Sequence, residues 1–389
     1  MTDLETRTAP PPAGALRRAA PALLGYAAVR ALGLATLALW SAARDKSAYT
    51  LLTARWDALW YTRVAELGYG YEVRLPNGDV HSNLAFFPLL PWLERLLAAV
   101  SPLSYADGGF VVSLCGSVAA AWGIFAVADH VYGRRAGVCA VLLWAVLPVG
   151  IVQSMAYSES LFTALAAWSL YAVLTGRWVT AGTLALLAGL TRPVGTAVVA
   201  AVWVTAVAAF VRDRREGADP GPGPRARRAL GMLLAPLGTA GYVLWVGHRT
   251  GKGALGYLDV QAGWRNGFDG GYAFARFVGD KFTSFPSALA GVGLVIGVVS
   301  VVWLYAVGVS QRQPLPLLVY TGVVTALALC ASSYFGSKPR LLLPAFPLLL
   351  PLALTLARLR SRWSALVLGC VAVVSAGYGA WWLNGSGPP

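Results

Sequence analysis

The chain has 389 residues, of which 57% are apolar and 12% are charged, and its 31 Lys and Arg residues against 17 Asp and Glu residues give a formal net charge of +14 at pH 7. Soluble domains carry about 25% charged residues, so this composition argues against a simple soluble enzyme and a disordered chain. We attribute the basic balance first to membrane topology and predict no nucleic-acid partner. The four cysteines lie singly within apolar runs, which is typical of buried residues rather than of a zinc site or a disulfide framework.

Apolar runs of near-membrane length follow one another along the chain, and about 20 helical residues are needed to cross the hydrocarbon core of a bilayer. Eleven such runs lie near residues 20–42, 109–131, 136–154, 157–175, 178–191, 194–211, 229–247, 287–309, 315–332, 341–357 and 364–382. We therefore predict an all-α polytopic membrane protein with about 11 transmembrane helices. The run 178–191 is short and ends at Thr191-Arg192-Pro193, a break that membranes tolerate mainly where backbone lines a cavity.

Arginines set the predicted orientation, because short loops rich in Lys and Arg stay in the cytoplasm. On one side of the threaded spans lie Arg134, Arg135, Arg177, Arg212, Arg214, Arg215, Arg225, Arg227, Arg228, Arg358, Arg360 and Arg362. We predict that this side and the N-terminus are cytoplasmic in a multi-pass protein of the cell membrane.

The spans divide the chain into four predicted parts. These are a cytoplasmic tail 1–19, a catalytic transmembrane module 20–211 with an external loop 43–108, a cytoplasmic basic loop 212–228, and a C-terminal transmembrane module 229–389 with an external loop 248–286. Segment 84–100 of the first loop is apolar but contains Glu94 and Arg95. We therefore predict that it forms a helix lying along the outer surface of the membrane.

The first external loop begins with a candidate catalytic carboxylate. Trp56, Leu59 and Trp60 share one face at helical spacing, and Asp57 and Tyr61 are i,i+4 neighbours that can face one another. A carboxylate beside aromatic rings at the membrane surface suits an enzyme that deprotonates an acceptor hydroxyl next to a lipid-borne donor. The alternative is an interfacial anchor helix with a solvated Asp57.

Three cations near the outer ends of spans are candidate phosphate ligands. Arg192 stands at a break between two apolar runs, and a cation in a membrane is a functional candidate by default. Lys338 and Arg340 enter the tenth run from outside, where they could clamp a phosphate at headgroup level. Snorkelling to lipid phosphates explains this pair about as well, and Glu159, at a helix junction, is alternatively a capping group.

Ordered motifs across most of the chain carry a family resemblance. They are Trp56-Asp57, Val64-Ala65-Glu66-Leu67-Gly68-Tyr69, Tyr71-Glu72, Ala85-Phe86-Phe87-Pro88, Tyr157-Ser158-Glu159, Thr191-Arg192 with Gly195, and Gln261, Trp264, Gly267 and Phe268. In this order they resemble the PIG-V family, GPI mannosyltransferase II and its bacterial relatives. Pro193-Val194 after Arg192 and an insertion at 73–82 depart from the family pattern, and both affect the acceptor pocket more than the reaction.

The resemblance implies a GT-C fold, in which polytopic enzymes take a sugar from a polyprenyl or dolichyl phosphate carrier on the non-cytoplasmic face. It implies Asp57 as the catalytic acidic residue and Arg192 as a ligand of the donor phosphate, to which Lys338 and Arg340 are added by charge and position. Candidate substrate-binding residues are Trp56, Trp60, Tyr61, Glu66, Tyr69, Glu72, Phe87, Tyr157, Glu159, Gln261 and Trp264.

These features predict an inverting glycosyltransferase that uses a polyprenyl-phosphate sugar, expected to be mannose, on the extracytoplasmic face. The expected partners are the polyprenyl-phosphate mannose donor, membrane lipids, and an acceptor glycan, glycolipid or protein. The sequence has no evident DxD pair, as fits a monophosphate donor, and we predict neither a metal site nor a cofactor beyond the lipid-linked sugar. A polytopic transporter or lipid flippase is the competing class, and a non-catalytic subunit is the third.

Overall fold

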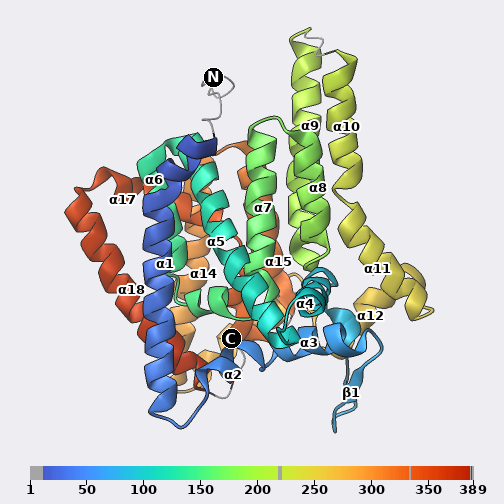
Figure 1. Ribbon diagram of the computed structural model, residues 1–389, viewed down its shortest axis with the longest axis vertical. Helices are drawn as coiled ribbons and strands as arrows, with labels where there is room; N and C mark the ends of the chain where they lie inside the picture. The colour runs from blue at the N-terminus through green and yellow to red at the C-terminus, as the bar shows by residue number, and fades with distance from the viewer. Residues whose placement is uncertain (1–11, 218–220, 333, 386, 388–389) are drawn as a thin grey trace.

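Long apolar helices run side by side through most of the molecule, as the computed structural model in Figure 1 shows. The structure describes residues 12–217, 221–332, 334–385 and 387. Within these ranges six helical stretches are long and apolar enough to cross a membrane: Gly14–Ala42, Tyr105–Tyr132, Pro193–Arg215, Pro222–Arg249, Ser287–Ser310 and Ser361–Leu383. The protein is therefore all-α, with the helix lengths of a polytopic membrane protein.

The six stretches contain α1 (Pro12–Ala42), α5 (Tyr105–Tyr132), η3 (Pro193–Gly195) with α9 (Thr196–Arg215), α10 (Pro222–Leu234) with α11 (Leu237–Arg249), α14 (Ser287–Ser310) and α18 (Ser361–Leu383). Shorter helices stand among them: α6 (Arg134–Ala145), α7 (Ser158–Leu174), α8 (Trp178–Gly189) and α15 (Leu315–Cys330). A bent pair joins η6 (Phe335–Ser337) and α16 (Lys338–Leu341) to η7 (Phe346–Leu349) and α17 (Leu350–Arg358), at an angle of 76°.

Several of the predicted spans are interrupted, among them 229–247 between α10 and α11. The run 136–154 is not one helix, because α6 ends at Ala145 and a separate 3-10 helix, η2 (Gly150–Ser154), follows. The run 341–357 is likewise broken between α16 and η7. Pro148 and Pro344 lie at these last two breaks, where a proline removes a helical N–H group. The average hydropathy of a run does not reveal such breaks. The number of membrane crossings therefore stays a prediction.

The segment 212–228, predicted as a cytoplasmic basic loop between spans, is largely helical. Helix α9 continues to Arg215, and α10 already begins at Pro222. Figure 1 shows these two helices projecting together beyond the other helices at the upper end. The basic residues of this segment are therefore carried largely on helices.

Short elements gather at the opposite, lower end of Figure 1. From the first predicted loop they are α2 (Ala48–Thr53), α3 (Asp57–Leu67), β1 (Glu72–Arg74), β2 (Val80–Ser82), η1 (Asn83–Ala85) and α4 (Leu89–Val100). The 12 residues of α4 rise about 18 Å, too little to cross a bilayer. Glu94 of α4 is fully buried, and burial raises the pKa of this carboxyl well above its ordinary value. The acid of this apolar helix thus points into the protein, and the position of α4 along the membrane surface stays a prediction.

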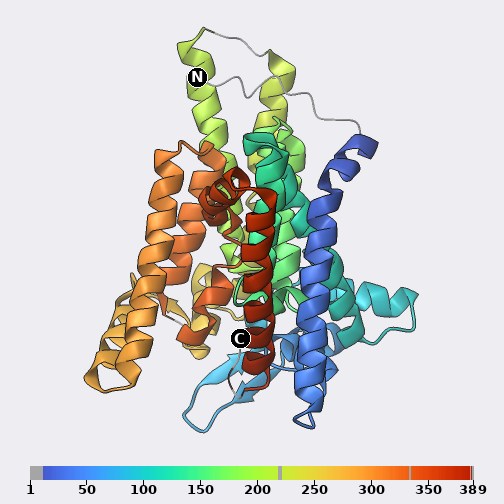
Figure 2. The same cartoon turned by 90° about the vertical axis from the view of Figure 1, so that its left-hand side faces the viewer.

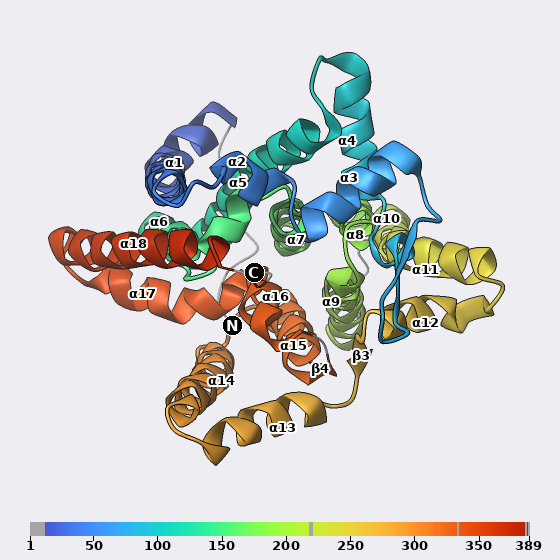
Figure 3. The same cartoon turned by 90° about the horizontal axis from the view of Figure 1, so that it is seen from below.

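The second predicted loop wraps around the same end, as Figure 3 shows from below. It contains η4 (Gly253–Leu255), α12 (Gly256–Gly263), β3 (Gly267–Phe268), α13 (Tyr272–Asp280) and η5 (Lys281–Thr283). Strands β1 and β2 pair antiparallel with Glu72 opposite Ser82, and β3 pairs antiparallel with β4 (Ala331–Ser332). The second pairing ties this loop to the segment that leads into α16.

Close helix packing fixes the ends of the helices that border this region. Helix α5 packs on α6 and α7, and α8 packs on α7 and α10. Helix α1 packs on α18, the blue and red helices that lie side by side in Figure 2. A Cβ atom at Gly182 of α8 would lie 2.3 Å from the carbonyl oxygen of Gly231 in α10. Only glycine allows these two backbones to approach so closely, as small residues do at helix contacts in membranes.

A buried arginine supports the broken span between α6 and η2. Arg30 of α1 is 7% exposed, and its guanidinium donates hydrogen bonds to the carbonyl oxygens of Ala145 and Gly150. Ala145 is the last residue of α6 and Gly150 the first of η2. Arg30 therefore satisfies carbonyl groups at the helix break that would otherwise be buried without a donor.

We expect Arg30→Met to lower the free energy of unfolding by about 1–3 kcal/mol, because it leaves these carbonyl groups without their donor. Thermal unfolding in detergent micelles measures the change. Arg17→Met, at an exposed position of the same helix, is the matched control and should unfold like the parent. Equal unfolding temperatures for all three proteins would show that Arg30 does not support the break.

Candidate active site

Asp57 begins α3 at the end of the molecule that carries the short elements. The preceding residue, Trp56, has a φ of 51° and a ψ of −124°, a left-handed conformation that is uncommon for a residue with a side chain. The guanidinium of Arg55 lies 4.1 Å from the centroid of the Trp56 ring. This strained turn sets the start of α3, so that the Asp57 carboxylate occupies the first helical turn and stays 26% exposed.

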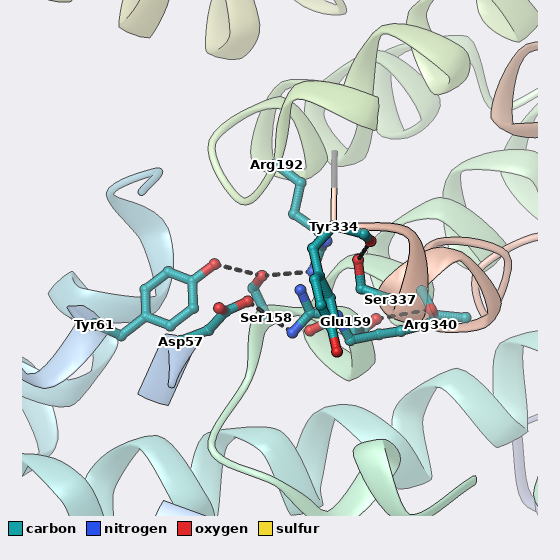
Figure 4. A network of polar contacts seen from close by, with 9 residues as sticks. Asp57, Tyr61, Ser158, Glu159, Arg192, Tyr334, Ser337 and Arg340 are labelled. Carbon is teal, nitrogen blue, oxygen red and sulfur yellow. Dashed lines mark hydrogen bonds and ion pairs between the residues drawn. The ribbon is translucent and has the colours of Figure 1, made fainter. Parts of the chain in front are cut away.

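Four charged side chains from distant segments meet at this point (Figure 4). Arg340 Nη1 lies 2.8 Å from Asp57 Oδ2, and Arg340 Nε lies 3.4 Å from Glu159 Oε1. Arg192 Nη1 lies 2.5 Å from the same Glu159 oxygen. We call Asp57, Glu159, Arg192 and Arg340 the charged quartet. Two arginines alternate with two carboxylates, so the formal charges of the quartet cancel.

The first turn of α7 supplies the buried part of the quartet. Ser158 and Glu159 stand at the helix N-terminus, where the helix dipole favours a negative charge. The Glu159 side chain is 1% exposed, against 13% for Arg192 and 10% for Arg340. In this structure Glu159 therefore contacts the two arginines and has almost no surface open to a substrate.

Tyr61 does not make the contact with Asp57 that its spacing suggests. Its hydroxyl instead shares a hydrogen bond of 2.7 Å with Ser158 Oγ, which also accepts a hydrogen bond of 3.2 Å from Arg192 Nη1. Burial raises the pKa of the Tyr61 hydroxyl, so this phenol stays protonated near neutral pH. Asp57 is consequently the group at this point that is both charged and open to an acceptor.

Arg192 reaches the quartet because the chain breaks where the sequence predicts. Helix α8 ends at Gly189, and Arg192 has an extended backbone with a φ of −159° and a ψ of 153° before Pro193 starts η3. The short helix α8 thus ends before the quartet, and the extended residue that follows turns its side chain toward α7.

Lys338 lies apart from the quartet, although it is two residues from Arg340. Side chains two positions apart on a helix differ by about 200° in direction, so the two cations of α16 point to different sides. Lys338 Nζ donates hydrogen bonds of 2.7 Å and 2.5 Å to the carbonyl oxygens of Ala328 and Ala331, at the end of α15. In this structure Lys338 caps a helix, and its predicted contact with the donor phosphate stays a prediction.

Tyr157 and Trp56 lie next to the quartet. The Arg340 guanidinium stands 5.1 Å from the centroid of the Tyr157 ring, which is fully buried. Such a contact between a cation and an aromatic face stabilises the guanidinium and restricts its position. Trp56 contributes its backbone turn to the placement of Asp57.

Two predicted aromatic residues form a separate cluster with Phe86. Trp60 stacks on Phe86 with 5.7 Å between ring centroids, and Trp264 lies edge-on to Trp60 at 4.8 Å. Trp264 Nε1 also donates to the carbonyl oxygen of Ser82 at 3.0 Å. This cluster joins the first and second predicted external loops beside α3.

The other predicted substrate residues fall into a packed group and an exposed group. Phe87 is buried against Tyr242, and the Tyr69 hydroxyl donates to the carbonyl oxygen of Phe86 at 2.8 Å. Gln261 Nε2 donates to the Tyr257 hydroxyl at 2.6 Å. Glu66 of α3 and Glu72 of β1 are exposed. Within the described residues, none of these side chains forms a hydrogen bond or an ion pair with a member of the quartet.

Ser158 is the residue at the site that the predicted set omits. It links Tyr61 to Arg192, and the signal for it was its place beside Glu159 at a helix start. Within the described ranges, no group of three or more His, Cys, Asp or Glu side chains is placed to hold a metal ion.

Comparisons with known proteins identify the fold. No protein-family model matches the chain, and no curated protein matches it by sequence. Among solved structures, it resembles ArnT from Cupriavidus metallidurans bound to undecaprenyl phosphate, with a TM-score of 0.51 and 16% identity over 91% of this chain and 63% of that one. It also resembles the oligosaccharyltransferase of Archaeoglobus fulgidus in the apo form, with a TM-score of 0.50 and 14% identity over 94% of this chain and 56% of that one. The fold is of the GT-C type.

At these identities the likeness concerns the fold alone. The chain spans less than two thirds of the length of each of these solved proteins. It is nevertheless a multi-pass membrane protein of the same architecture, because long apolar helices and the GT-C fold coincide in it. Membership of the PIG-V family stays a prediction from the sequence motifs.

Proposed function

We propose that the protein is an inverting glycosyltransferase that takes a sugar from a polyprenyl-phosphate carrier, with mannose as the sugar that the motifs favour. The observation that carries this proposal is the charged quartet in a GT-C fold. It presents a partly exposed carboxylate, Asp57, beside two arginines that are nearly buried. A base and a cationic phosphate site are the two groups that such a transfer requires.

The proposed reaction is a single displacement at the anomeric carbon of the donor sugar. The oxygen of the acceptor hydroxyl attacks the anomeric carbon, and its proton passes to the Asp57 carboxylate. The bond from that carbon to the phosphate oxygen breaks with its electron pair on the oxygen, so the charge of the departing phosphate rises from about −1 to −2. Arg340 and Arg192 stabilise this developing charge. A β-linked donor then gives an α-linked product, because a single displacement inverts the anomeric centre.

The quartet also favours a donor with a single phosphate. Its two carboxylates already contact arginines, and an added phosphodiester brings one negative charge, which two guanidinium groups can hold by hydrogen bonds. The acceptor is a glycan, a glycolipid or a protein.

The test is transfer by the purified protein in vesicles that contain polyprenyl-phosphate mannose labelled in the sugar. We expect the label to enter a new glycosidic bond when extracts of the bacterial envelope supply the acceptor, and free polyprenyl phosphate to accumulate. Movement of the labelled donor across the bilayer without a new bond would instead indicate the transporter or flippase class. If the protein neither transferred the sugar nor moved the donor, the proposed use of this donor would be refuted.

We further propose that the quartet faces the extracytoplasmic side, since the basic ends of α9 and α10 lie at the opposite end of the molecule. Single cysteines at Glu66 and Glu216, both exposed, report the two sides in a background without the four native cysteines. We expect an impermeant maleimide to label Glu66→Cys in intact cells and Glu216→Cys only after permeabilisation. The reverse pattern would invert the proposed orientation.

A further inference from the structure

Arg340 holds two carboxylates at once, and this arrangement bears on how a phosphate enters. A guanidinium can hold a phosphate with two parallel N–H groups along either of two edges, Nε with Nη2 or Nη1 with Nη2. In Arg340, Nε on the first edge lies 3.4 Å from Glu159 Oε1 and Nη1 on the second edge lies 2.8 Å from Asp57 Oδ2, both as ion-pair contacts without hydrogen-bond geometry. Each edge therefore already faces a carboxylate.

The surroundings of Arg340 leave little room for a ligand to add to this arrangement. Its side chain is 10% exposed, its Nε and Nη1 atoms are buried, and the Tyr157 ring covers one face of the guanidinium. A phosphate that forms two parallel hydrogen bonds with one edge of the guanidinium must consequently displace one of the two carboxylates from the arginine.

The two carboxylates differ in how easily they can leave. Glu159 is 1% exposed and also contacts Arg192, so separating it from both arginines would leave a buried, unpaired charge. Asp57 is 26% exposed and contacts Arg340 alone among the quartet's arginines. Asp57 is thus the carboxylate that the phosphate displaces from Arg340.

We infer that the donor phosphate and the Asp57 carboxylate compete for Arg340, so that donor binding releases Asp57 Oδ2 to accept the acceptor's proton. This inference rests on the proposed function and adds an order of events to it: the donor phosphate binds first, and Asp57 then accepts the proton. Before the phosphate binds, Arg340 holds the base. In the loaded site Arg340 and Arg192 hold the phosphate, Glu159 positions both arginines, and Asp57 faces the acceptor hydroxyl.

Competition predicts that removing the carboxylate charge improves donor binding although it removes the base. In Asp57→Asn the quartet has a net charge of +1, and an amide is a much weaker competitor for a guanidinium than a carboxylate. We expect the dissociation constant for undecaprenyl phosphate, used as the probe, to fall about tenfold, which corresponds to about 1.4 kcal/mol. Asp259→Asn is the charge-matched control, because Asp259 forms an exposed ion pair with Lys252.

The probe is titrated into each protein in lipid nanodiscs, and thermal unfolding without ligand confirms that all three proteins are folded. Tighter binding by Asp57→Asn, with parent-like binding by Asp259→Asn, supports the competition. Unchanged or weaker binding by a folded Asp57→Asn overturns the competition while the proposed function stands, provided that the parent binds the probe and transfers sugar. A parent that neither binds nor transfers refutes the proposed function and this inference together.

Discussion

Asp57→Asn is expected to lower the turnover of sugar transfer by about 10³-fold while the protein remains folded. A positioned general base contributes about 10²–10⁴-fold to rate, and Asn retains the shape of Asp without its capacity to take a proton. The carboxylate is partly exposed and begins α3, so the substitution creates no cavity. Transfer of labelled mannose from polyprenyl-phosphate mannose, at saturating donor, measures the effect.

Asp259→Asn serves here as the control, and it should transfer sugar at the parental rate. If Asp57→Asn were to transfer sugar as fast as the parent, Asp57 would not be the base. A non-catalytic subunit also predicts no effect of Asp57→Asn, but in that case the purified parent would itself transfer no sugar.

Arg340→Met is expected to reduce kcat/KM for the donor by about 10²–10³-fold. The substitution removes a donor aimed at the developing phosphate charge and leaves the buried Glu159 with Arg192 as its remaining partner in the quartet. Arg340→Lys should recover only part of the loss, because one ammonium cannot replace the Nε and Nη1 contacts that the planar guanidinium makes with two carboxylates. Steady-state kinetics with varied donor concentration measures both variants.

A merely structural role for Arg340 would give a different pattern. It would lower the amount of folded protein without changing kcat/KM per folded molecule, and Lys and Met would act alike. Arg276→Met, at an exposed position of α13, controls for the loss of one cation and should leave kcat/KM at the parental value.

The charged quartet was predicted in part from the sequence. Asp57 became a candidate through its place beside aromatic residues at a span end, and Arg192 through its place at a helix break, because both signals are local in the chain. The catalytic and phosphate-binding roles expected of them came from the resemblance to the PIG-V family. The contact between Asp57 and Arg340 joins residues 283 positions apart, and it depends on where the fold places α16, from which Arg340 reaches the first turns of α3 and α7. Spacing along the chain contains no information about such a contact.

Lys338 and Arg340 show most directly that spacing along the chain does not predict which side chains meet. By charge and position the sequence treats them alike, and both were predicted to hold the donor phosphate. The short helix α16 turns them about 200° apart, so that Lys338 caps the end of α15 while Arg340 joins the quartet. Glu159 shows a similar difference, since burial at the start of α7 makes it a partner of two arginines rather than an open contact for a substrate.

Composition and hydrophobic pattern by themselves determined that this is an all-α membrane protein with an acidic residue in the segment that follows its first apolar run, because apolar length and local spacing are properties of the chain alone. The tertiary structure decided where the spans break, which cations meet the two carboxylates, and which carboxylate stays exposed. Those features depend on helix direction and on desolvation by distant neighbours, and both arise only when the helices pack.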